Sequence, residues 1–184
     1  AQALQGCHGP SAILWCNPQN PGGTVYQEDQ IRALCVAAQA HQALVVSDEI
    51  WADLLLNPTA QHVPLGRIAS PEHPTITLMA ATKTFNVAGF RCALAIIPHP
   101  PTRERFSHLQ LAMPHVSPLA FLVTEVCLRE GWDWHQSLLT ALRANRDRVA
   151  HWVAQFPGFT CTHGDASFLS WISQNLGAID LDQA

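Results

Sequence analysis

The sequence has little charge, and this shortage already excludes several classes of protein. Charged residues make up 13% of the 184 residues and hydrophobic residues 48%, a balance typical of a folded chain and not of a disordered one. The net charge of −4 provides no basic patch, so nucleic acid is not an expected partner. No apolar run reaches the length of a transmembrane helix, and no basic-then-apolar signal pattern opens the chain, so no membrane partner is expected.

Cysteine pairs and metal-binding patterns are also missing. The six cysteines are scattered without a CxxC pair, and most lie in apolar segments. This pattern predicts reduced core thiols in a cytoplasmic protein, with neither a disulfide framework nor a zinc site. The 10 histidines show no HExxH-like spacing. No GxGxxG follows a predicted strand, which argues against a dinucleotide-binding domain.

Apolar runs alternate with a helical pattern in the first half of the chain. The runs at 11–16, 43–47, 75–80 and 92–97 predict strands, and the spacing of apolar residues over 26–41 predicts a helix. A strand, a helix and a second strand in this order imply a right-handed crossover and a parallel sheet. The expected fold class is therefore α/β, with a mostly parallel sheet and flanking helices.

The chain changes character after the prolines at 98–101. Helical patterns cover 102–113, 117–130 and 132–156, and two short apolar segments, 159–161 and 168–172, predict strands of a second unit. We therefore expect the sheet region to be followed by connecting helices and by the start of a smaller domain.

Three polar residues follow predicted strands. Asn20 lies in a loop with two Asn-Pro steps and two glycines, which can hold an amide in one place but can also be an ordinary turn. Asp48 ends a buried strand; it either binds a partner or caps a helix beginning at Ile50, with Glu49 as the solvated carboxylate. Lys83 stands between two strands, where it is either a nucleophile toward a carbonyl or an ammonium in water.

The sheet topology predicts that these residues meet. Ligands in parallel sheets lie at the carboxyl ends of the strands, and Asn20, Asp48 and Lys83 all belong to that edge. A lysine can form a Schiff base with an aldehyde cofactor, a carboxylate can keep a pyridine nitrogen protonated, and an amide can hold the neighbouring phenolic oxygen. This combination of groups indicates pyridoxal 5'-phosphate, whose ring accepts electrons from a carbanion.

Three segments resemble the successive signatures of fold type I pyridoxal-phosphate enzymes. They are Asn17-Pro-Gln-Asn-Pro-Gly-Gly23, Ser47-Asp-Glu-Ile-Trp-Ala-Asp53 and Thr82-Lys-Thr-Phe-Asn-Val-Ala-Gly-Phe-Arg91. Within that superfamily the sequence is most similar to the cystathionine β-lyase-like (C–S lyase) branch of the class I/II aminotransferases. The segment around Trp51 and a later one, Gly164-Asp-Ala-Ser-Phe-Leu-Ser-Trp171, carry this finer resemblance.

The resemblance implies a role for each matching residue. Lys83 matches the Schiff-base lysine, Asp48 the partner of the pyridine nitrogen, and Asn20 the ligand of the ring oxygen. Arg91 matches a phosphate-binding arginine, and Thr82 a hydroxyl near the phosphate.

Two positions depart from the family pattern. Ala80 replaces a serine that contacts the phosphate in many relatives. Trp51 replaces a tyrosine that is frequent in aminotransferases, which favours the lyase branch. The indole N–H of Trp51 can donate to a bound group, so we include Trp51 among the cofactor-binding candidates, although such an aromatic is more often a core residue.

The resemblance also implies that the chain is a fragment, since enzymes of this kind are much longer and the sequence does not begin with Met. We expect residues 1–114 to be the C-terminal half of the cofactor-binding large domain, 115–156 the linking helices, and 157–184 the start of the small domain. The implied function is a pyridoxal-phosphate C–S β-lyase acting on a small amino-acid substrate, as a homodimer when complete. An aminotransferase and a truncated, non-catalytic fragment or binding module remain alternatives.

Overall fold

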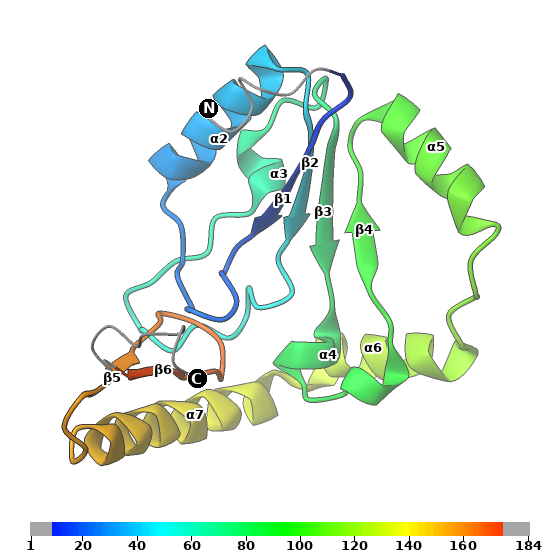
Figure 1. The fold of residues 1–184 in the computed structure, drawn as a ribbon. Coiled ribbons are helices and arrows are strands. Elements are labelled where there is room, and N and C mark those ends of the chain that lie inside the picture. The colour runs from blue at the N-terminus through cyan, green and yellow to red at the C-terminus, as the bar shows by residue number, and fades with distance from the viewer. Residues whose placement is uncertain (1–8, 175–184) are drawn as a thin grey trace, which may run out of the picture.

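The chain forms two sheets that are connected by helices (Figure 1). The structure, a computed structural model, describes residues 9–174. Cys7, which we expected to be a reduced core thiol, and residues 175–184 of the expected small domain lie outside that range. The larger sheet has the order β1-β2-β3-β4, with β1 at Ala12–Cys16, β2 at Leu44–Asp48, β3 at Thr75–Met79 and β4 at Leu94–Ile96.

The register of the larger sheet brings three strand ends to one edge. β1, β2 and β3 run parallel, with Cys16 opposite Asp48 and Asp48 opposite Leu78, whereas β4 runs antiparallel to β3. Figure 1 shows the arrowheads of the three parallel strands at their lower ends, with α4 at Ala81–Thr84 below β3. The predicted parallel sheet is therefore confirmed, and its carboxyl edge is the edge on which Lys83 lies.

One face of this sheet is covered by α2, Glu28–Ala40, and by the short helix α3, Leu65–Ile68. The core between them contains the buried residues Ile31, Ala38, Val45 and Leu65. Side chains alternate along a strand, so Ser47 lies on this covered face while Asp48 projects from the opposite face. The alternation explains how a carboxylate at the end of a buried strand stays outside the core.

The C-terminal part consists of three longer helices and the smaller sheet. They are α5 at Pro100–Gln110, α6 at Pro118–Glu130, α7 at Trp132–Val153, β5 at Phe159–Thr162 and β6 at Trp171–Gln174. The Ser117 hydroxyl accepts a hydrogen bond from Ala120 N at 3.2 Å, which confirms the expected start of α6. Within residues 9–174, no helix combines the length and apolar content needed to cross a membrane.

The segments that connect the strands contain short helices that the sequence analysis did not predict. The segment 57–74, expected to be a loop, contains α3, and the lysine stretch contains α4 followed by a 3-10 turn, η1, at Ala88–Phe90. Asp48 does not cap a helix, because residues 50–53 form a turn. That alternative for Asp48 is wrong.

Candidate functional site

Lys83 lies at the carboxyl edge of the sheet, beside an aromatic ring. It is the only lysine in the sequence, and the four-residue helix α4 carries it directly after β3. Its side chain is half-buried, and Nζ lies 5.8 Å from the ring centroid of Trp51. Among residues 9–174 the Lys83 ammonium forms no ion pair, so its amine stays available.

The end of β2 supplies the carboxylate, and the turn at 50–53 that follows it supplies this aromatic ring. Asp48 is half-buried, and its Oδ1 accepts a hydrogen bond from Ile50 N at 3.2 Å. Trp51 is only 3% exposed and contacts Phe168 in an edge-to-face arrangement, with ring centroids 4.7 Å apart. The end of β2 thus presents Asp48 on the face of the sheet opposite α2 and α3, and the following turn places the Trp51 ring beneath Lys83 Nζ.

The two asparagines of the loop after β1 differ in their surroundings: Asn17 is buried and hydrogen-bonded, and Asn20 is exposed. Asn17 is 1% exposed; its Oδ1 accepts from Tyr26 N at 3.1 Å and its Nδ2 donates to Val63 O at 3.5 Å. Asn20 is exposed, and its side-chain amide makes no hydrogen bond with the described part of the chain. Asn17 therefore fixes the loop, which leaves the Asn20 amide free for a ligand.

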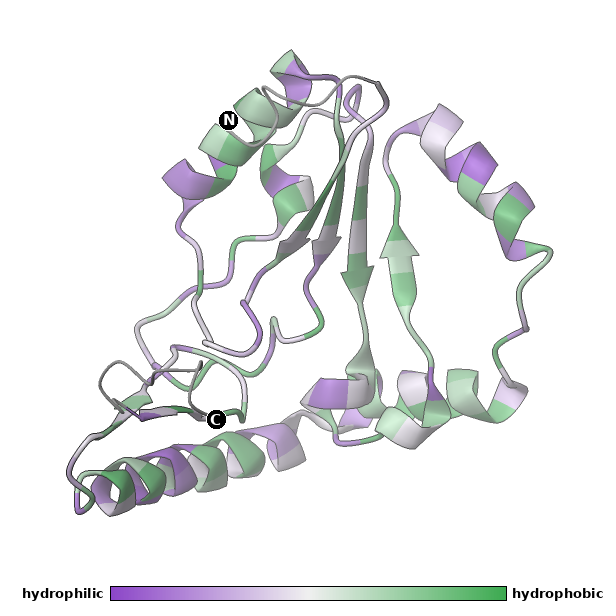
Figure 2. Cartoon of the chain, in the orientation of Figure 1, coloured by the Kyte–Doolittle hydropathy of each residue, from purple (hydrophilic) through white to green (hydrophobic). Residues whose placement is uncertain are grey.

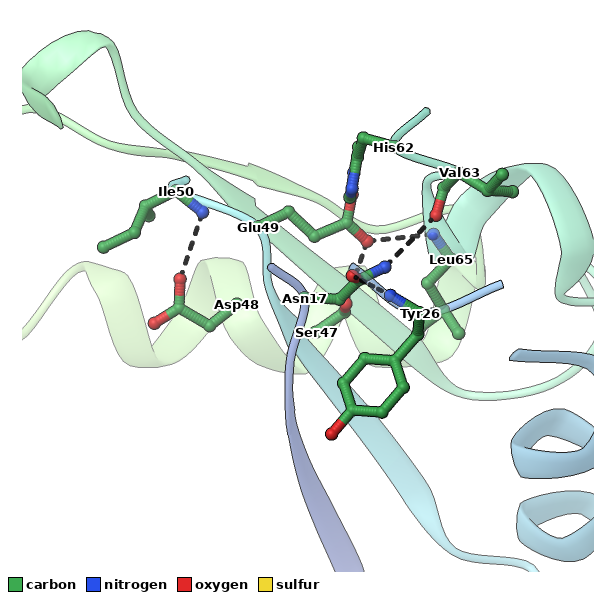
Figure 3. A network of polar contacts seen from close by, with 9 residues as sticks. All are labelled: Asn17, Tyr26, Ser47, Asp48, Glu49, Ile50, His62, Val63 and Leu65. Carbon is green, nitrogen blue, oxygen red and sulfur yellow. Dashed lines mark hydrogen bonds and ion pairs between the residues drawn. The ribbon is translucent and has the colours of Figure 1, made fainter. Parts of the chain in front are cut away.

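Glu49 is the residue whose surroundings sequence reasoning missed. We expected it to be solvated, but it is 1% exposed (Figure 3). Its Oε1 accepts from Ser47 Oγ at 2.8 Å and from Leu65 N at 2.9 Å, and its Oε2 lies 2.8 Å from His62 Nε2. The alternation of side chains along β2 could have found it, because Glu49 continues the buried row of Val45 and Ser47.

The segment 62–65 ties the ends of two strands together. It contributes the His62 and Leu65 contacts to Glu49 after β2 and the Val63 carbonyl to Asn17 after β1. Figure 3 shows these groups on one side, with Asp48 turned away from them. We call residues 62–65 the strap, because it links the loop that carries Asn20 to the turn that carries Asp48.

Thr82 and Arg91, the expected phosphate ligands, have no side-chain partner among the described residues. Thr82 is half-buried, and its carbonyl accepts from Val87 N at 3.0 Å. Arg91 is exposed and follows η1 in the left-handed region, with φ of 51°. Their roles stay predictions.

Cys16 reports on the charge of Asp48. The two residues are opposite each other in the register, and the Cys16 thiol donates to Pro18 O at 3.3 Å. Burial raises the pKa of the Cys16 thiol, a hydrogen bond from the Asn20 backbone lowers it, and the negative charge of Asp48 raises it.

A segment of the C-terminal part lies against the site loops. Ala166 N donates to Gly23 O at 3.0 Å, and Ser167 N donates to Leu54 O at 2.9 Å. Gly23 has φ of 72°, and a Cβ there would lie 2.4 Å from Ala166 O. Only glycine permits this approach, which places Phe168 against Trp51.

One hollow among the described residues lies at the opposite end of the sheet from Lys83. Its volume is about 530 Å³, and it is lined by the starts of β1 and β2 and by α5, including Ser11, Leu44 and Phe106. It contains none of the residues that the sequence predicted as ligands. The candidate ligands Asn20, Asp48 and Lys83 therefore lie outside this hollow.

Comparison with known proteins supports the same reading of the fold. Cystathionine beta-lyase of Corynebacterium glutamicum is 30% identical over 165 residues, which are 89% of this chain and 44% of that protein. The crystal structure of OvoB has a TM-score of 0.85 and 42% identity, covering 90% of this chain and 44% of that one. Cystalysin from Treponema denticola, whose structure contains a pyridoxal 5'-phosphate cofactor, has a TM-score of 0.82 and 29% identity, covering 88% and 42%.

The chain thus spans less than half the length of each of these relatives. The profile of the family described as "Aminotransferase class I and II" matches residues 1–176, nearly the whole chain. The fold is the fold type I architecture of these enzymes, as expected from the three signature segments. The chain belongs to the class I and II aminotransferase family.

Proposed function

We propose that this chain is part of a pyridoxal-phosphate C–S β-lyase. The substrate class is an amino acid with sulfur at Cβ; the Cβ–S bond breaks to release a thiol, and one water replaces the nitrogen of the remainder to give pyruvate and ammonia. The observation that supports the proposal is the parallel arrangement of β1, β2 and β3, because Asp48 ends β2 and the segments carrying Asn20 and Lys83 follow the carboxyl ends of β1 and β3. The similarity to the Corynebacterium glutamicum cystathionine beta-lyase supports the choice of reaction.

The side chains present fit this cofactor. The Lys83 amine has no ion-pair partner in the described range, and the only hydrogen bond to the Asp48 carboxylate there comes from Ile50 N. Lys83 Nζ would hold the cofactor covalently, Asp48 would keep its ring nitrogen protonated, and the Asn20 amide would hold its ring oxygen. Thr82 and Arg91 would bind its phosphate. When bound, the cofactor supplies an electron sink for negative charge at the substrate Cα.

The same residues would carry the proton transfer. With an amino-acid substrate bound, the Lys83 amine would take the Cα proton as a general base. The neighbouring indole of Trp51 is buried and would keep water away from that amine. Trp51, where aminotransferases often carry tyrosine, is the residue within the site that favours elimination over amino transfer.

The test is incubation of the full-length protein with cystathionine. We expect pyruvate to be released without any keto-acid acceptor, and we expect Lys83→Ala to abolish this release. The Thr102→Val variant, altered in α5 away from the site, serves as the control. Pyruvate release at the parent rate by the Lys83→Ala protein would overturn the proposal.

The second candidate is an aminotransferase, a reaction that the family assignment also supports. It would use the same residues, with Lys83 again taking the Cα proton. Strict dependence on a keto-acid acceptor in the cystathionine assay identifies this alternative. If the full-length protein neither releases pyruvate nor transfers an amino group, the non-catalytic reading holds.

We further propose a homodimer and the division into large domain, linking helices and small domain at 1–114, 115–156 and 157–184. The dimer is supported by the family resemblance and by α6, which exposes Leu119, Phe121, Leu122, Val126 and Leu128. Figure 2 shows hydrophobic residues along much of this helix. The free thiols of the five cysteines in the described range support a cytoplasmic location.

A further inference from the structure

Lys83 and the next residue, Thr84, both contact the turn at 50–53, which follows Asp48. Lys83 Nζ lies over the Trp51 ring, and the Thr84 hydroxyl donates to Asp53 Oδ2 at 3.0 Å. Thr84 has 0% exposure, so water does not compete for this hydrogen bond at the hydroxyl. The lysine helix is thus attached to the Asp48 turn at two successive positions.

Asp53 is held from a second direction by the long helix α7. His135 is 4% exposed, and its Nε2 donates to the Asp53 carbonyl at 2.8 Å. Phe85, which follows Thr84, lies against the His135 ring with centroids 6.0 Å apart. Asp53 therefore connects α4, through its side chain, to α7, through its backbone.

The helix α4 is too short to fix Lys83 by its own hydrogen bonds. It has four residues, and its end is marked by a single bond from Phe85 N to Ala81 O at 2.9 Å. Asn86 then has a φ of 56°, in the left-handed region, so the right-handed helix does not continue past it. Because helices of this length are not stable by themselves, tertiary contacts must determine where the Lys83 amine lies.

We propose that Asp53 is a positioning residue for Lys83, acting through its hydrogen bond to Thr84. This contact fixes α4 against the turn, so that the Lys83 amine and the Asp48 carboxylate keep a constant separation. The inference rests on the proposed function, since it assigns the contact a purpose only if Lys83 is the reacting amine.

The direct test is Thr84→Val, which removes the hydroxyl and preserves the volume of the side chain. The matched control is Thr102→Val, because the Thr102 hydroxyl also pairs with a side chain, His99 Nδ1 at 2.8 Å, away from the site. With cystathionine and the full-length protein, we expect Thr84→Val to lower kcat about tenfold or more and to change KM by less than about threefold. Equal kcat values for the two variants would overturn the inference.

Substitutions at Asp53 provide the rescue experiment. Asp53→Asn keeps an acceptor oxygen for Thr84 and should stay close to the parent kcat, whereas Asp53→Ala should match Thr84→Val. The double variant Asp53→Ala/Thr84→Val should be no slower than either single variant, because both remove the same contact. Additive losses would contradict the proposed contact. If Thr84→Val does not fold, the kcat values of Asp53→Asn and Asp53→Ala provide the test, and equal values for these two variants would overturn the inference.

A second readout does not depend on turnover. Lys83 is the only lysine among these 184 residues, so reductive methylation of the cofactor-free protein can be followed on the peptide that contains it by mass spectrometry. We expect the methylation rate to change at least about threefold in Thr84→Val and to remain unchanged in Thr102→Val. If borohydride fails to attach the cofactor to Lys83 in the parent, the proposed function fails. If attachment occurs but Thr84→Val behaves like the control, only the inference about Asp53 fails.

Discussion

At the residue scale, Asp48 and Cys16 form a pair whose charges can be measured. They lie opposite each other at the ends of β2 and β1, on the same face of the sheet. Burial and the charge of Asp48 both raise the pKa of the Cys16 thiol, while the Asn20 backbone lowers it. The thiol therefore senses whether the Asp48 carboxylate lies where the proposed chemistry needs it.

Replacing Asp48 by Asn should lower the pKa of Cys16, because the variant lacks the negative charge that opposes the thiolate. The thiolate is the reactive form, so alkylation of Cys16 should begin at lower pH and be faster at pH values below the parent midpoint. Alkylation rates against pH, followed by mass spectrometry, measure this change.

Cys35 is the internal control for that experiment. Its pKa is raised by burial and lowered by Arg32, so Asp48→Asn should leave its alkylation profile unchanged. Superimposable Cys16 profiles for the parent and Asp48→Asn would show that the carboxylate does not lie beside the end of β1.

At the element scale, the strap at 62–65 holds the loop after β1 and the turn after β2 in place relative to each other. Glu49 is its main attachment point, with a 0% exposed side chain opposite the 9% exposed side chain of His62. A buried carboxylate with three donors is stable only while all of them stay in place, because each group left unpaired in the interior costs free energy.

Glu49→Ala should lower the free energy of unfolding by about 3 kcal/mol, since it leaves His62 and the Leu65 N–H without their acceptor. Urea unfolding of the full-length protein measures the change. The control is Glu28→Ala, which breaks the exposed pair with Arg32 on α2 and should cost less than about 0.5 kcal/mol. Similar losses in the two variants would mean that the strap is not anchored through Glu49.

The regular elements could be predicted because their signals are local. The apolar run of β2 predicts a buried strand, and the spacing of Ile31 and Ala38 predicts the buried face of α2. The order strand, helix, strand predicts the parallel pairing of β1 and β2. The antiparallel direction of β4 and the strap depend on contacts between distant segments. No local pattern distinguishes Glu49 from a solvated carboxylate except its place in the buried row of β2.

The candidate site divides in the same way. The prediction that Asn20, Asp48 and Lys83 share one edge follows from topology, because Asp48 ends β2 and the other two lie shortly after the carboxyl ends of β1 and β3. The attachment of α4 through Asp53 could not be read from the sequence, since Thr84 and Asp53 are 31 positions apart. The sheet topology can therefore be predicted from local patterns, whereas a hydrogen bond between distant side chains cannot.

At the scale of the whole molecule, the two faces of the larger sheet are covered unequally. α2 and α3 bury Val45 and Ser47 on one face, whereas Leu14, opposite Val46 on the other face, is 83% exposed. Asp48 belongs to this second face. The chain also spans less than half the length of its relatives, so activity belongs to the full-length protein and is tested there.

The central claim is that Lys83 holds the cofactor at this edge of the sheet. The most direct measurement is borohydride reduction of the full-length protein purified with pyridoxal 5'-phosphate, followed by peptide mass spectrometry. We predict loss of the yellow absorption and a cofactor-derived mass on the peptide that contains Lys83, the only lysine of this chain. An unmodified Lys83 in the reduced protein, with the absorption unchanged, would contradict the account.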